Sequence, residues 1–231
     1  ELEALIAANP RSKDAQLVYR DWLEEQGLVE DGRVKLAALV DHKGVLTEVE
    51  YQHGYIRSCL LRIPGETDFT LAHALELLLD CPGPGRFVEK LTLGLAQFDD
   101  NHYKDACDAI GAYPRYNLQS LYVGDYDPDE CELNWSSIDA SGMWPALPNL
   151  RDLVLRAGSM TLGEIVLPEL LSFTTICGGL GYDAAMSIAN ATWPKIEILS
   201  LQYGQGAQGA TNGMEVVQTI LAARNMPKLR Q

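Results

Sequence analysis

Basic residues are scarce in this 231-residue chain, and their scarcity limits the partners it can have. Lysine and arginine together number 18, against 32 aspartate and glutamate residues, so the formal net charge is -14 at pH 7. A field of this sign repels phosphate backbones and anionic lipid surfaces. We therefore expect neither nucleic acid nor a membrane as a partner.

Long apolar runs and paired cysteines are missing as well. No run reaches the roughly 18 consecutive apolar residues that a transmembrane helix needs. The five cysteines are odd in number, widely spaced and contain no C-x-x-C pair, which is typical of neither a disulfide framework nor a zinc site. We expect buried free thiols in a cytoplasmic protein that holds no metal and no cofactor.

An acidic stretch is the first candidate for chemistry. Asp125, Asp127 and Asp129 follow the D-x-D-x-D spacing of calcium loops, whose carboxylate oxygens surround a hard cation. Such loops place Gly at the sixth position and Glu at the twelfth, whereas this chain has Glu130 and Ser136 there. A solvated insertion loop over residues 125–132 is the preferred interpretation, and ion binding stays open as the alternative.

Two further patterns are weaker. His102 and Cys107 lie five residues apart, and Cys–His pairs can form nucleophiles. Cys107, however, falls on the apolar stripe of an expected helix, where thiols behave as small hydrophobic groups. Residues 204–209 spell G-x-G-x-x-G, but no surrounding pattern predicts the doubly wound sheet of a dinucleotide-binding fold. The chain is therefore expected not to be an enzyme.

Helical periodicity dominates the start of the chain. Apolar residues at positions 2, 5 and 6 predict a first helix, and a stripe that includes Tyr19 and Trp22 predicts a second over 13–26, ended by Gly27. A third helix is expected over 32–42. Segments 2–10 and 17–27 together resemble the bacterial repeat-companion domain, a short helical segment that often precedes repeats. The resemblance implies a helical capping domain over 1–45, without an activity of its own.

The remainder of the chain, residues 46–231, contains an internal repeat. Segments of the form L-x-x-L-x-L recur at spacings of 20 to 32 residues, and several are preceded by a proline signature such as Leu147-Pro148-Asn149-Leu150. Each segment predicts a short strand whose alternate residues point inward, and parallel stacking would bury one continuous core. The expected strand centres are Cys59, Leu91, Leu121, Leu153, Phe173 and Leu199.

Helices are expected between most of these strands, over 70–80, 104–113, 183–192 and 214–224, with an extended connection between Leu153 and Phe173. The pattern resembles leucine-rich repeats, which implies an α/β solenoid of irregular units with the helical segment at its start. One departure is that the Asn or Cys usual five residues after the central leucine is replaced, for example by Ala96 and Gly158.

The strand residues that flank the inward-facing ones are the candidate binding surface. They mix basic, hydroxyl and aromatic groups, and Tyr and Arg are enriched at binding hot spots. We expect a monomeric interaction module that recognises a protein partner on the concave strand face. The alternative is a targeting or regulatory arm of a larger enzyme whose catalytic domain lies outside this sequence. The expected partner-binding residues are Arg62, Lys90, Thr92, Tyr122, Asp152, Val154, Arg156, Thr174, Ser200 and Gln202.

Overall fold

The computed structural model describes residues 12–65, 67–97, 101–204, 218–220, 222 and 226–229. Two helices come first, α2 (Lys13–Glu25) and α3 (Val29–Asp41). The Ser12 side chain caps α2 by accepting a hydrogen bond of 3.3 Å from the backbone N–H of Ala15. Gly27, at φ +69°, turns the chain between the two helices. The expected helix over residues 1–8 lies outside the described residues.

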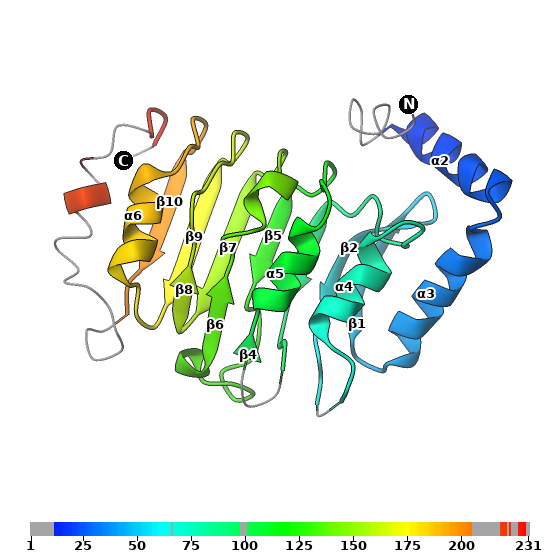
Figure 1. The fold of residues 1–231 in the computed structure, drawn as a ribbon, viewed down its shortest axis with the longest axis horizontal. Coiled ribbons are helices and arrows are strands. Elements are labelled where there is room, and N and C mark those ends of the chain that lie inside the picture. The colour runs from blue at the N-terminus through cyan, green and yellow to red at the C-terminus, as the bar shows by residue number, and fades with distance from the viewer. Residues whose placement is uncertain are drawn as a thin grey trace.

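A seven-stranded sheet forms the body of the molecule (Figure 1). Its strands pair in the order β1-β2-β3-β5-β7-β9-β10, and every pair is parallel except the β1–β2 hairpin. The expected centres are confirmed, because Cys59, Leu91, Leu121, Leu153, Phe173 and Leu199 lie side by side in register. The strands are β1 (Leu46–Gln52), β2 (Tyr55–Leu61), β3 (Lys90–Leu93), β5 (Ser120–Val123), β7 (Asp152–Ala157), β9 (Ser172–Cys177) and β10 (Ile198–Gln202).

The connections between neighbouring parallel strands contain a helix, a strand of a second sheet, or both. Helices α4 (Leu71–Leu79), α5 (Lys104–Gly111) and α6 (Tyr182–Asn190) confirm three of the expected helices, whereas the one expected over 214–224 lies mostly outside the described residues. Three connections contribute strands to a second, parallel sheet of order β4-β6-β8, and β4 lies in the same connection as α5. Strand β8 confirms the extended connection between Leu153 and Phe173. The remaining elements are β4 (Asn101–His102), β6 (Ser136–Asp139), β8 (Ser159–Thr161), η1 (Leu133–Trp135) and η2 (Trp144–Ala146).

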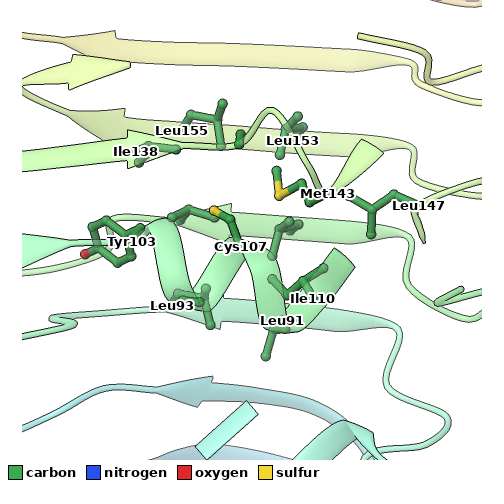
Figure 2. Packing of buried hydrophobic residues seen from close by; sticks show 14 of the residues in the cluster. Leu91, Leu93, Tyr103, Cys107, Ile110, Ile138, Met143, Leu147, Leu153 and Leu155 are labelled. Atoms are coloured by element: carbon green, nitrogen blue, oxygen red, sulfur yellow. The ribbon is translucent and has the colours of Figure 1, made fainter. Parts of the chain in front are cut away.

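The core lies between the main sheet and these connections (Figure 2). Leu91, Leu93, Leu153 and Leu155 point from the strands toward Cys107 of α5, and all five are buried. Fully burying a leucine side chain contributes roughly 1.5–3 kcal/mol, so this layer holds the strands in register. The inward alternation within each strand thus sets both the core and the opposite face of the sheet.

The leucine-rich-repeat solenoid expected from the spacings is wrong as a description of the fold. The chain forms an α/β fold around one mostly parallel, mixed sheet, which opens with the antiparallel β1–β2 hairpin. Strands that alternate with helical periodicity specify parallel strands with crossovers, and many α/β folds share that pattern. The connections also differ from one another along the chain, since some contain a helix, others a strand of the second sheet, and one contains both.

Strand β1 was not anticipated. Its polar sequence, Leu46–Gln52, carries little of the apolar alternation that marked the other strands. The available signal was the His53-Gly54 pair, since both residues have positive φ, 51° and 91°, as two-residue hairpin turns require. The turn returns the chain into β2, where the parallel part of the sheet begins.

The N-terminal helices pack at the β1–β2 end of the molecule. Tyr19 and Leu23 of α2 form a small cluster with Phe87, and Tyr55 of β2 packs against it. Helix α3 contacts α4. The boundary expected at residue 45 remains a prediction. Among the described residues, no helix is long and apolar enough to cross a membrane.

Candidate open sheet face

One face of the main sheet carries nine of the ten expected partner-binding residues, and the tenth, Arg62, lies directly after the end of β2. Helices α4, α5 and α6 lie on the other face (Figure 1). Burial alternates along the strands, so that in β7 the residues Leu153, Leu155 and Ala157 are buried while Asp152, Val154 and Arg156 are not. We call the face that bears this second set the open face. Its side chains form three rows that run across the strands.

The middle row supplies apolar and hydroxyl surface. Its members are partly or fully exposed and come from five successive strands of the sheet: Thr92, Tyr122, Val154, Thr174 and Ser200. Burial raises the pKa of Tyr122, and the Asp125 charge raises it further. The phenol is therefore neutral at physiological pH and presents an aromatic surface with a polar tip.

The first row supplies opposite charges. Lys90 and Asp152 are both exposed, and Ser120 lies between them in register. Strands lie about 4.8 Å apart, so two strand spacings separate the Lys90 and Asp152 backbones by roughly 10 Å. At this distance the two side chains are not held together as an ion pair by their backbones, so the face presents one positive and one negative charge to a partner.

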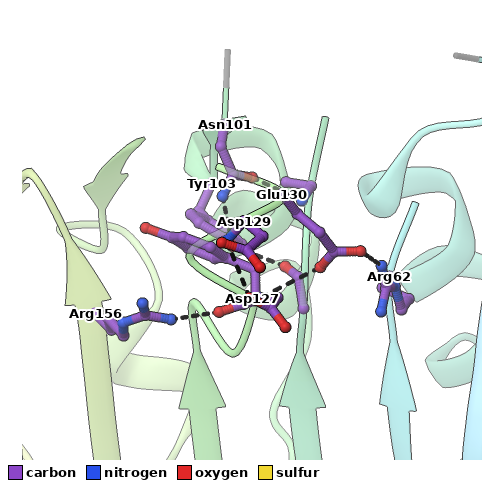
Figure 3. Close-up of polar contacts among 10 residues, drawn as sticks. Arg62, Asn101, Tyr103, Asp127, Asp129, Glu130 and Arg156 are labelled. Carbon is purple, nitrogen blue, oxygen red and sulfur yellow. Dashed lines mark hydrogen bonds and ion pairs between the residues drawn. The ribbon is translucent and has the colours of Figure 1, made fainter. Parts of the chain in front are cut away.

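The third row departs from expectation, because its two arginines are already engaged. Arg62 forms an ion pair with Glu130, and Arg156 donates hydrogen bonds from Nη1 to the carbonyls of Gly124 (3.2 Å) and Tyr126 (2.6 Å) (Figure 3). The guanidinium of Arg156 also lies 4.5 Å from the centre of the Tyr126 ring. These arginines hold the acidic loop 125–132 instead of presenting free positive charge.

The acidic loop is folded by its own side chains. Asp127 Oδ1 accepts a hydrogen bond of 2.9 Å from the Asp129 N–H, and Glu130 Oε2 accepts one of 3.2 Å from the Asp127 N–H. Within the described part of the chain, no group of three or more acidic, histidine or cysteine side chains is arranged to hold a metal ion. The arrangement favours the solvated loop over the calcium interpretation.

A buried hydrogen bond connects the loop to the second sheet. Tyr126 is buried, and its hydroxyl lies 2.7 Å from Ser136 Oγ of the second sheet. Sequence reasoning missed this supporting role. No spacing in the sequence predicts this contact, because Tyr126 and Ser136 come together only in the folded chain.

The weaker chemical patterns gain no support. Burial raises the pKa of Cys107 to about 12, so its thiol stays protonated and unreactive near neutral pH. His102 is exposed, and its Nδ1 lies 2.5 Å from Ser137 Oγ. Of the G-x-G-x-x-G segment, residues 205–209 lie outside the described residues. Gly204, two residues after the end of β10, has φ +74° and forms an isolated bridge with Gly179.

Comparisons with known proteins inform the fold alone. No protein-family model matches the chain. No curated protein matches it either. A crystal structure of a protein from Bacteroides fragilis is similar over 68% of this chain and 46% of that chain, with a TM-score of 0.58 and 24% sequence identity. The chain thus spans about half the length of this structural neighbour. The resemblance to repeat-companion proteins remains a prediction.

Proposed function

We propose that this protein is a non-enzymatic interaction module that binds a protein partner on the open face. The observation that carries the proposal is the sheet's one-sided covering: three helices pack on one face, while the other presents rows of half-exposed side chains. A rigid, pre-formed sheet loses little conformational freedom on association, which favours binding.

The composition of the open face supports a protein partner. Its centre carries Tyr122 and Val154, and its margin carries the charges of Lys90 and Asp152. Interfaces commonly combine an apolar, aromatic centre with a polar rim that fixes orientation. The partner we propose therefore presents apolar side chains to the middle row and one charge of each sign to the first row.

Matched tyrosine variants test the proposal. Tyr122 lies on the open face, whereas Tyr182 lies on α6 and is 52% exposed. Proteins captured from the native lysate on immobilised Tyr122→Ala are compared with those captured on Tyr182→Ala and on the parent. We expect Tyr122→Ala alone to lose specifically retained proteins. At a binding hot spot, this substitution weakens the free energy of partner binding by about 2 kcal/mol. Equal capture by all three columns would overturn the open-face assignment.

A cytoplasmic location is the second part of the proposal. All five cysteines carry free thiols, and four of them, Cys59, Cys107, Cys131 and Cys177, are buried. Free thiols persist in reducing compartments, which supports the cytoplasm.

A further inference from the structure

A cavity outside the open face gathers three cationic side chains. It has a volume of about 520 Å³ and lies where α3, the end of α4 and the segment after α5 meet. Sites for small organic ligands commonly have volumes of roughly 300–1,000 Å³. The side chains that matter here are Lys35, Asp80, Cys81, Arg86, Tyr113 and Arg115. Among the described residues that line it, three are cationic (Lys35, Arg86 and Arg115) and one, Asp80, carries a carboxylate.

Arg115 is the fixed part of this cavity. The residue is only 7% exposed. Its guanidinium donates to the carbonyls of Ile110, Leu79 and Ala109 and to Asp80 Oδ1, at 3.0 to 3.3 Å. These bonds use four of its five N–H groups and leave one on Nη1 without a partner among the described residues.

Lys35 is held in a similar way. Its Nζ donates to the carbonyls of Asp80 (3.0 Å) and Cys81 (3.3 Å), so one of its three N–H groups remains. Burial lowers the pKa of Arg115, the bonded Asp80 opposes this, and the Arg86 charge lowers it further. An anion in the cavity would relieve the burial of charge and the repulsion between the two arginines.

We propose that this cavity binds a phosphate monoester of a small organic molecule. Phosphate oxygens accept hydrogen bonds from guanidinium and ammonium groups, and a dianion matches more than one cation. The Tyr113 ring is 58% exposed, and it supplies an apolar wall for the organic part of the ester. The proposal is independent of partner binding on the open face.

The reactivity of the Cys81 thiol can show whether a ligand occupies the cavity. It lines the cavity and is the exposed thiol among five cysteines, all of which lie in described parts of the chain. The Tyr19 hydroxyl donates to its Sγ at 3.2 Å. The rate of Cys81 alkylation by iodoacetamide, a neutral reagent, is followed by peptide mass spectrometry with and without phenyl phosphate. Within each variant, the ratio of the two rates cancels any change in the thiol's own reactivity.

The expected result is protection that depends on the phosphate and on the cations. Millimolar phenyl phosphate should slow alkylation of the parent several-fold, whereas benzyl alcohol, which lacks the phosphate, should not. In Lys35→Gln and in Arg86→Gln, half-protection should need about tenfold more phenyl phosphate. Arg33→Gln on the exposed side of α3 removes the same charge and should retain the parent's protection.

Three results would overturn the proposal. The first is no protection of the parent by phenyl phosphate, and the second is equal protection by benzyl alcohol. The third is an equal loss of protection in Arg33→Gln and Lys35→Gln, which would mean that only net charge matters. The comparison of the two compounds uses the parent protein, so it decides the proposal even if a variant fails to fold.

Discussion

Tyr103 connects the end of β3 in the main sheet to β4 of the second sheet through two buried hydrogen bonds. Its buried hydroxyl donates to the Gly94 carbonyl (2.7 Å) and accepts from Asn101 Nδ2 (3.0 Å). Tyr103→Phe leaves both groups without this partner in a buried site, so we expect the free energy of unfolding to fall by roughly 1–3 kcal/mol. Urea denaturation measures it. The control, Tyr113→Phe, alters an exposed hydroxyl and should match the parent. A parent-like stability for Tyr103→Phe would contradict this role.

Two buried thiols make stability depend on alkaline pH. Burial raises the pKa of Cys59 and of Cys107 to about 12 each. In the unfolded chain a thiol ionises near pH 8.5, so from there to about pH 12 the unfolded state binds fewer protons than the native state. The free energy of unfolding should therefore fall as pH rises, by up to about 1.4 kcal/mol per pH unit for each thiol.

A variant that lacks the Cys107 thiol separates the effect of thiol ionisation from general alkaline unfolding. Cys107→Ala should reduce the slope of stability against pH between pH 9 and the folded pKa of about 12. Val123→Ala, a change at another fully buried position, should lower stability at every pH and keep the parent's slope. Denaturant titrations at a series of pH values measure both slopes. Identical slopes for Cys107→Ala and the parent would refute the assignment.

At the scale of single elements, α2 is attached mainly through Tyr19. The ring is 3% exposed and lies 5.4 Å from Phe87 and 6.0 Å from Tyr55, centre to centre. Trp22, the more obvious residue in the sequence, is only partly buried. We expect Tyr19→Ala to cost roughly 3–5 kcal/mol and Trp22→Ala clearly less. Thermal unfolding compares the two, with Val18→Ala as the exposed control. A larger loss for Trp22→Ala would show that α2 packs differently.

Arg156 is one of the groups that hold the acidic loop 125–132 in place. Hydrogen bonds to charged groups contribute about 1.5–3 kcal/mol each. Arg156 donates one to Tyr126 within the loop and one to Gly124 just before it, and it also contacts the Tyr126 ring. Arg156→Ala should therefore speed hydrogen–deuterium exchange in 125–132 at least about tenfold, since 1.4 kcal/mol corresponds to a factor of ten. Arg151→Ala, an exposed position one residue before β7, is the control. Unchanged exchange in the loop would show that other contacts hold it.

For the whole molecule, the sequence predicted the strand centres and most of the helices between them. An element that is buried on one side carries apolar residues at a regular spacing, every second residue in a strand and every three to four in a helix. Leu91, Leu121 and Leu153 mark the strands for this reason, and the register confirms them. The same period could not distinguish a repeat solenoid from the mixed α/β sheet observed. It also gave no sign of β1, whose polar residues lack the alternation.

The candidate surface was predictable only in part. Alternation predicted that the candidate residues share one face, and the register places nine of the ten there, with Arg62 just beyond the end of β2. It could not show that Arg62 and Arg156 bind the acidic loop, because Glu130 and Tyr126 reach them only after the chain has folded. The free charges of the open face are consequently those of Lys90 and Asp152 rather than the arginines.

Site-specific photo-crosslinking in living cells tests the open-face proposal most directly. A photoreactive phenylalanine analogue replaces the half-buried Tyr122 on the open face or the exposed Tyr182 on α6. We predict a discrete crosslinked protein from position 122 that is absent from position 182. Adding Lys90→Glu to the position-122 variant should reduce the yield of that product. Crosslinks from position 182 alone, or the same products from both positions, would contradict partner binding on the open face.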